Sequence, residues 1–261
     1  MTDEELLALN QKGFLPGPGE SEEDFRQRVE EVKKSFFASG EQSIPYSHWD
    51  WARIHLREVY DFMPDCLPAF YSDKGLMPWQ GAASWIDGGR IASIQLRESL
   101  RKGHYLGLYK REEILVHEVV HAARSAFKED RFEEFFAYAT SESRFRRVLG
   151  PIVRRPWEVW PFLACCFAGA FFPAAFLGAG LWAALGFARL ARGHWILQKA
   201  GEKLAEVTDD ARIARAVLLR LSDSEIEKVG RGETVGDASL RWRLIRLAYW
   251  KKEGYGTENH R

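Results

Sequence analysis

Residues 114–124 read ILVHEVVHAAR, and the prediction of the fold and of the site starts from this stretch. It contains the H-E-x-x-H pattern, with histidines at 117 and 121. Residues at i and i+4 share one face of a helix, so His117 and His121 can bind one metal ion. Carboxylates at 112 and 113, and the lack of glycine or proline before Gly150, favour that helix. Its other face is apolar and should enter the core: Val116, Val120, Ala123 and Phe127.

A third metal ligand is expected after a short charged turn at residues 128–131. Residues 132–140, FEEFFAYAT, again favour a helix, and a carboxylate at its start can return to the metal. Glu134 is the predicted ligand, with Glu133 as the alternative, because a one-residue error rotates a side chain by about 100°. Two histidines, one glutamate and a water describe an open catalytic zinc site. Glu118 follows the first ligand and could take a proton from that water.

These motifs resemble a known group of enzymes. H-E-x-x-H followed by a glutamate on a second helix looks like the gluzincin branch of the zincin metallopeptidases. Residues 134–137, EFFA, are similar to an element of the Mlc titration factor A and anthrax lethal factor families. In those families the glutamate is the third zinc ligand. More loosely, the same residues match the E-x-x-A-[DN] element of membrane-associated gluzincins, with Tyr138 in place of the last residue. The resemblance covers residues 111–145.

Several side chains near this helix could stabilise the oxyanion of a tetrahedral intermediate. His104 and Tyr105 stand just before the helix, and Tyr138 stands after it. Tyr109 and Arg124 are equally possible by position. Packing is an alternative role for each of these side chains.

Short apolar runs at 67–71, 81–86 and 90–96 predict a small, partly antiparallel sheet before the metal helix. Asp87-Gly88-Gly89 is typical of a hairpin turn between the last two. The resemblance implies that an edge strand of this sheet pairs with the extended substrate. Either residues 81–84 or residues 91–93 could supply that edge.

Composition narrows the classes of protein to which this chain can belong. The chain has 37 basic and 37 acidic residues, so no global basic field favours nucleic acid. Three cysteines, two of them adjacent, do not form a disulfide framework and suit a reducing compartment. The acidic N-terminus, MTDEELLALNQKG, lacks the features of a cleavable signal peptide.

Residues 159–188 contain no charged side chain, and Pro173 divides this run near its middle. An uncharged run of this length predicts a membrane segment. Arginines flank it on both sides, which favours a helical hairpin with both ends in the cytoplasm. A single kinked span and a buried pair of core helices are the alternatives. Four tryptophans suit interfacial anchors: Trp157, Trp160, Trp182 and Trp195.

The predicted fold is α+β, a mainly helical minimal zincin domain with a small mixed or antiparallel sheet, plus a membrane-inserted helical segment. We expect N-terminal helices at 1–45, the catalytic domain at 46–150, the membrane segment at 156–195 and a C-terminal helical region at 196–261.

The predicted function is that of a membrane-associated endopeptidase with Zn²⁺ as cofactor. Its expected partners are a peptide or protein substrate and a lipid bilayer, without nucleic acid. The expected location is the bacterial inner membrane, with the catalytic domain on the cytoplasmic side. A non-catalytic membrane adaptor and a zinc hydrolase of a non-peptide substrate are the alternatives.

Overall fold

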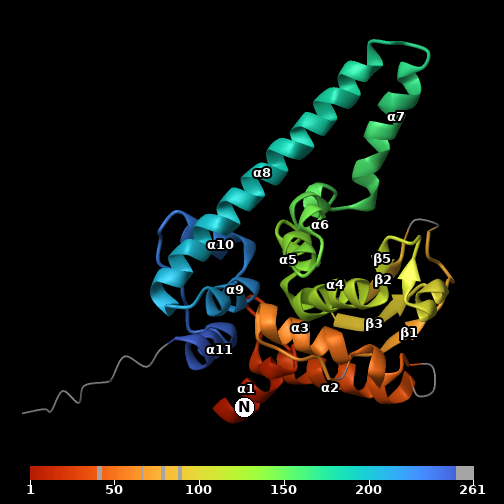
Figure 1. Cartoon of the computed structure of the whole chain (residues 1–261). Coiled ribbons are helices and arrows are strands. Elements are labelled where there is room, and N and C mark those ends of the chain that lie inside the picture. The colour runs from red at the N-terminus through yellow and green to blue at the C-terminus, as the bar shows by residue number, and fades with distance from the viewer. Residues whose placement is uncertain (40–42, 66, 78–79, 88–89, 251–261) are drawn as a thin grey trace, which may run out of the picture.

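The computed structural model describes residues 1–250 apart from 40–42, 66, 78–79 and 88–89, and it shows a mainly helical chain (Figure 1). Three helices, α1 (Asp3–Gln11), α2 (Glu22–Ser39) and α3 (Asp50–Tyr60), come first. Thr2 and Glu5 form a capping box at the start of α1, which satisfies backbone N–H groups that the helix leaves free. Cys66, the Gly88-Gly89 turn and the C-terminal tail lie outside the described residues.

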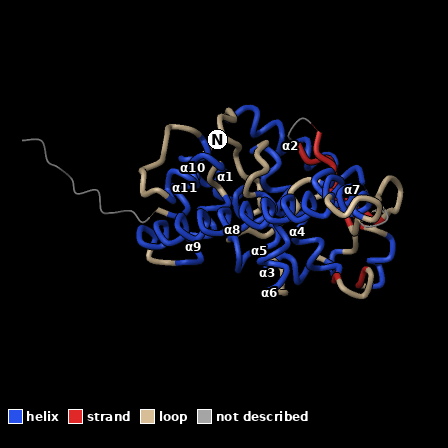
Figure 2. The backbone as a smooth tube through the Cα atoms, turned by 90° about the horizontal axis from the view of Figure 1, so that it is seen from above, coloured by secondary structure: helices blue, strands red, loops and turns tan. Residues whose placement is uncertain are grey.

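The predicted sheet is present and small. Strands β1 (Ala69–Tyr71), β2 (Ala82–Asp87) and β3 (Arg90–Leu96) form one sheet in the order β1-β3-β2, and β4 (His104–Tyr105) pairs with β5 (Tyr109–Lys110). β3 runs parallel to β1 and antiparallel to β2. Residues 91–93 therefore lie in the central strand, and residues 82–84 lie at an edge. Seen from above, the strands occupy one end of the molecule (Figure 2).

Helix α4 (Arg111–Arg124) carries the H-E-x-x-H pattern and packs against β2 and β3 (Figure 1). Its predicted apolar face is confirmed, because Val116, Val120, Ala123 and, just beyond the helix, Phe127 are all buried. The short helix α5 (Glu133–Ala139) packs on α4, and α6 (Arg144–Leu149) packs on α5. The histidines are thus left on the side of α4 that faces α5.

The uncharged run forms two packed helices, α7 (Val159–Gly169) and α8 (Ala175–Thr208), which project from the body as a hairpin (Figure 1). The chain turns back at residues 170–174, around Pro173. The polar end of α8 packs against α9 (Ala211–Leu219) and α10 (Asp223–Gly230).

The expected α+β fold with a membrane-inserted segment at 156–195 is wrong. The described chain is mainly helical, and none of its helices combines the length and the apolar character needed to cross a membrane. α7 has 11 residues and at about 1.5 Å per residue falls short of a hydrocarbon core of about 30 Å. α8 is long enough, but it carries Arg189, Arg192 and the charged residues that follow. A lipid bilayer as a partner stays a prediction from the sequence.

Buried polar contacts join the C-terminal helices to the end of α4. Arg124, at the end of α4, donates from Nη1 to the carbonyl oxygens of Leu219 and Leu221 at 2.6 and 3.1 Å. Its guanidinium lies 4.2 Å from the ring centroid of Phe127. A buried charge needs such hydrogen bonds, so the end of α4 is held at a fixed place on the C-terminal helices.

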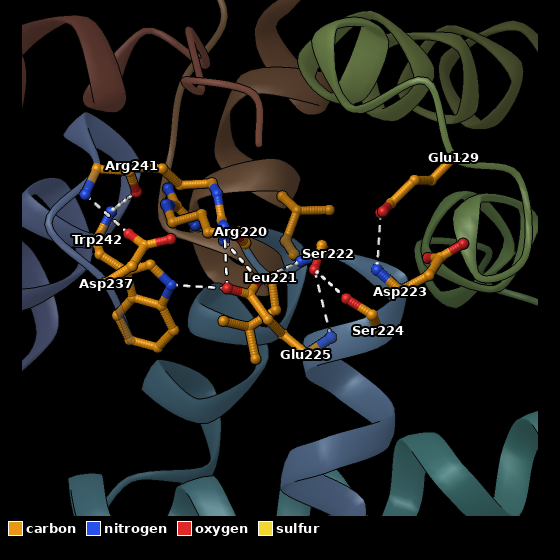
Figure 3. A network of polar contacts seen from close by, with 12 residues as sticks. Glu129, Arg220, Leu221, Ser222, Asp223, Ser224, Glu225, Asp237, Arg241 and Trp242 are labelled. Carbon is orange, nitrogen blue, oxygen red and sulfur yellow. Dashed lines mark hydrogen bonds and ion pairs between the residues drawn. The ribbon is translucent and has the colours of Figure 1, made fainter. Parts of the chain in front are cut away.

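A second polar cluster fixes α11 (Leu240–Tyr249) to α10. Arg241 is 3% exposed and donates to both carboxylate oxygens of Glu225, at 2.7 and 2.9 Å. Trp242 Nε1 donates to the same carboxylate at 2.7 Å (Figure 3). Burial raises the pKa of Glu225, but the bonds from Arg241 outweigh burial and hold that pKa below its usual value. Ionised Glu225 therefore stabilises the folded state.

We expect Glu225→Gln to destabilise the protein by about 3 kcal/mol at neutral pH, because it leaves Arg241 buried without its counter-charge. The folded-state pKa of Glu225 is lowered, so its contribution is full above the ordinary value of 4.5 and is lost as pH falls through the lowered pKa. Urea denaturation at a series of pH values measures the difference. The exposed pair Arg231–Glu233 supplies the control, and Glu233→Gln should cost far less. A Glu225→Gln penalty that does not shrink in acid would contradict this role.

Candidate metal centre

Three predicted ligands meet where α4 contacts α5. One ligand atom from each of His117, His121 and Glu134 lies within 4.8 Å of the others. The two Nε2 atoms are 3.2 Å apart. Glu134 Oε2 lies 3.6 Å from His117 Nε2, and its Oε1 lies 3.5 Å from His121 Nε2. The carboxylate thus faces both imidazoles, as a shared metal ion requires.

These separations fit zinc. Zinc binds histidine nitrogen and carboxylate oxygen at about 2.0–2.2 Å, and the edges of a tetrahedron of that size are about 3.3–3.6 Å long. The three observed separations, 3.2, 3.5 and 3.6 Å, lie close to that range. Two imidazoles and one carboxylate are also the donor set of open, catalytic zinc sites. The group could therefore hold zinc with a position left for a water or a substrate.

Glu133, the alternative ligand, lies beside the group instead of within it. Its Oε1 accepts a hydrogen bond from Nδ1 of His121 at 2.9 Å. A histidine that donates from Nδ1 to a carboxylate presents Nε2 to a metal in a fixed orientation. Adjacent glutamates thus take separate places, with Glu134 toward the two Nε2 atoms and Glu133 behind His121.

Glu118 is 9% exposed and is held by β2. Ser84 Oγ donates to Glu118 Oε2 at 2.6 Å and lies 3.3 Å from the Glu118 carbonyl oxygen. Glu118 lines a cavity of about 200 Å³ together with His117, Tyr105, Tyr109 and Tyr138. The carboxylate is therefore oriented next to an open space at the ligand group.

The pKa values of the two histidines are shifted in opposite directions. Burial lowers the pKa of His117 well below its usual value, and the charge of His121 lowers it further. Burial also opposes the charge on His121. The hydrogen bond to Glu133 and the nearby charges of Glu134 and Glu118 outweigh that burial and raise the pKa of His121 to about 9.

The pKa values of two neighbouring carboxyl groups are shifted as well. Burial raises the pKa of Glu134 to about 7, and the charges of Glu118 and Glu133 add to that rise against the effect of His121. Burial likewise raises the pKa of Glu118, against the effects of His121 and Ser84. A divalent cation at the ligand group would favour the ionised forms of these nearby carboxyl groups.

Three of the five candidate oxyanion stabilisers, all of them tyrosines, line the cavity at the site. The Tyr138 ring contacts the His117 ring with centroids 4.7 Å apart, and burial raises the pKa of Tyr138 to about 12. Tyr105 lines the same cavity as Glu118, and so does Tyr109. His104 is exposed on β4 and is not among the described residues that line this cavity. Arg124 points instead to the carbonyl groups of residues 219 and 221.

Hydrogen bonds with the start of α10 fix the turn between α4 and α5. Asp223, at the start of α10, donates from its backbone N to Glu129 Oε2 at 2.7 Å, and its Oδ2 accepts from the Arg131 backbone N at 3.0 Å (Figure 3 shows the first bond). Lys128 adopts a left-handed conformation with φ of 55°. No local pattern predicts these contacts, because residues 223 and 129 are far apart in the chain.

No family model matches the chain, and neither the curated proteins nor the solved structures include a significant match.

We expect Glu134→Ala to abolish stoichiometric zinc binding, because a ligand is lost. Glu133→Ala should weaken it about 10–100-fold, because only the orientation of His121 is lost. Competition with a chromophoric chelator measures both affinities. Glu142→Ala, which removes an exposed glutamate paired with Lys110, is the control and should leave zinc binding unchanged. Full zinc binding by Glu134→Ala with none by Glu133→Ala would exchange the two roles.

Proposed function

We propose that this protein is a zinc-dependent endopeptidase. The observation that carries the proposal is the grouping of His117, His121 and Glu134, with Glu118 oriented by Ser84 at the edge of the same cavity. The resemblance of H-E-x-x-H and EFFA to gluzincin motifs supports the same reaction.

His117, His121 and Glu134 would hold the ion. Bound zinc supplies an electrophile that acidifies a water and polarises a peptide carbonyl. The protein's own groups move the protons. Glu118 takes the proton of the attacking water as general base and later delivers it to the leaving amine as general acid.

The proposal also includes two tyrosines as donors to the carbonyl oxygen as negative charge develops on it. Tyr138 and Tyr105 line the cavity with Glu118, and each carries a phenolic hydroxyl. Burial raises the pKa of Tyr138 to about 12, so this hydroxyl stays protonated and can donate a hydrogen bond.

A peptide would have a place to bind beside these groups. β2 pairs with β3 on one side, and among the described strands no other pairs with it. Gly81 and Ala82, at the start of this strand, line the cavity with His117 and Glu118. An extended peptide could add to this edge by main-chain hydrogen bonds. This edge supports a peptide over a non-peptide substrate, and the position of Glu118 supports an enzyme over a non-catalytic adaptor.

We expect Glu118→Gln to keep zinc and to lower peptide cleavage at least about 100-fold, because a general base contributes about 10²–10⁴-fold. Mass spectrometry of an unbiased peptide mixture, with zinc content measured on the same samples, tests this expectation. Glu112→Gln on the same helix is the matched control and should keep activity. A Glu118→Gln protein with full activity would remove Glu118 from the reaction, and a wild type that holds zinc but cuts no peptide would contradict the proposed function.

A further inference from the structure

A second cavity, of about 530 Å³, joins the ligand group to the base of the α7–α8 hairpin. His117, Glu134 and Tyr138 line one side of it, and Val159, Trp160 and Leu163 of α7 line another. Any group bound here would touch both the metal ligands and an apolar wall.

The apolar wall continues outward along α7. Trp160, Leu163 and Phe167 follow one another at intervals of three and four residues, which places them on one face of α7, and Phe171 follows in the turn just after the helix. We call these four residues the α7 stripe. They are between 46% and 73% exposed. The Phe167 and Phe171 rings contact each other with centroids 5.6 Å apart.

The α7 stripe does not hold the hairpin together. The opposite face of α7 packs on α8, where Cys165 lies against Gly178 and Gly169 lies against the Phe176 ring. Burial of one such side chain contributes about 1.5–3 kcal/mol. Several large apolar side chains exposed together are therefore uncommon on proteins without a binding role.

Arg154 supplies a polar group at the same place. It lines the second cavity, and its Nε is buried with no hydrogen-bond partner among the residues that the structure describes. The wall of the cavity beside the apolar residues therefore also carries a guanidinium group.

We propose that the α7 stripe binds an uncharged apolar segment of the protein substrate, next to the bond that is cut. The stripe begins inside the cavity that reaches His117 and Glu134, so a bound segment would lead directly into the metal centre. No residue from 159 to 188 is charged, so the surface offers a polar segment no ionic contact. The substrates are then proteins with an apolar stretch beside the cleavage site. The inference rests on the proposed function.

Binding can be tested without turnover. The probes are two fluorescent peptides of equal length with the same polar half, joined either to a Leu/Ala segment or to a Gly/Ser segment. In the Glu118→Gln protein, anisotropy should show the Leu/Ala peptide binding at least about tenfold more tightly. Phe167→Ser with Phe171→Ser should reduce that affinity by about tenfold or more, since tenfold corresponds to about 1.4 kcal/mol, within the burial of one apolar side chain.

Leu177→Ser with Leu181→Ser is the matched control. These leucines are 78% and 63% exposed, have the same spacing and lie on α8, so the affinity should not change. An equal loss in this control, or equal affinity for the two peptides, would overturn the proposal. So would phosphatidylcholine vesicles that bind through Phe167 and Phe171 while peptide binding is insensitive to both. Stripe-dependent binding together with no cleavage by the wild type would support the binding surface and contradict the peptidase.

Discussion

The burial of several ionisable groups at the contact of α4 and α5 is the constraint on which the rest of the structure depends. Two imidazoles and the carboxyl groups of Glu118, Glu133 and Glu134 share a space that is largely removed from water. Buried charges of like sign cost free energy unless an opposite charge lies among them. Burial is the main cause of the raised pKa values of Glu118 and Glu134, and a divalent cation would favour the ionised forms of both groups. A cluster of this kind is typical of functional sites.

The surrounding fold holds these ionisable groups close together. β2 brings Ser84 to Glu118, and the start of α10 brings Asp223 to the turn that precedes Glu133. The buried guanidinium of Arg124 ties the end of α4 to the C-terminal helices. Elements from three parts of the chain therefore position ligands that lie within 18 residues of one another. This arrangement explains why a site built on two helices needs the whole molecule to hold its geometry.

Local patterns predicted the metal helix and its core face, because both depend on the spacing of residues within one helix. The strands at residues 67–96 are also a local prediction, because they rest on short apolar runs separated by turn residues. The choice between Glu134 and Glu133 could not be made from the sequence. It depends on the rotation of α5, which the left-handed Lys128 and the contacts with Asp223 determine. The partnership of Ser84 with Glu118 is equally non-local.

The uncharged run shows a different limit. Its composition predicted a membrane segment and Pro173 marked the place where the chain turns, but neither specifies how far each helix extends. The turn at residues 170–174 leaves α7 with 11 residues, and α8 continues into a charged half that packs on the body. The α7 stripe also could not be assigned a neighbour from the sequence, because its relation to the metal ligands is created by the fold.

The central claim is that α4 and α5 form an open zinc site with two histidines and one glutamate. X-ray absorption spectroscopy at the zinc edge, on protein loaded with equimolar zinc, tests it most directly. We predict two imidazole ligands and oxygen ligands at about 2.0–2.2 Å, with one imidazole fewer in His121→Ala. Zinc bound through sulfur, or a spectrum that His121→Ala leaves unchanged, would contradict the account.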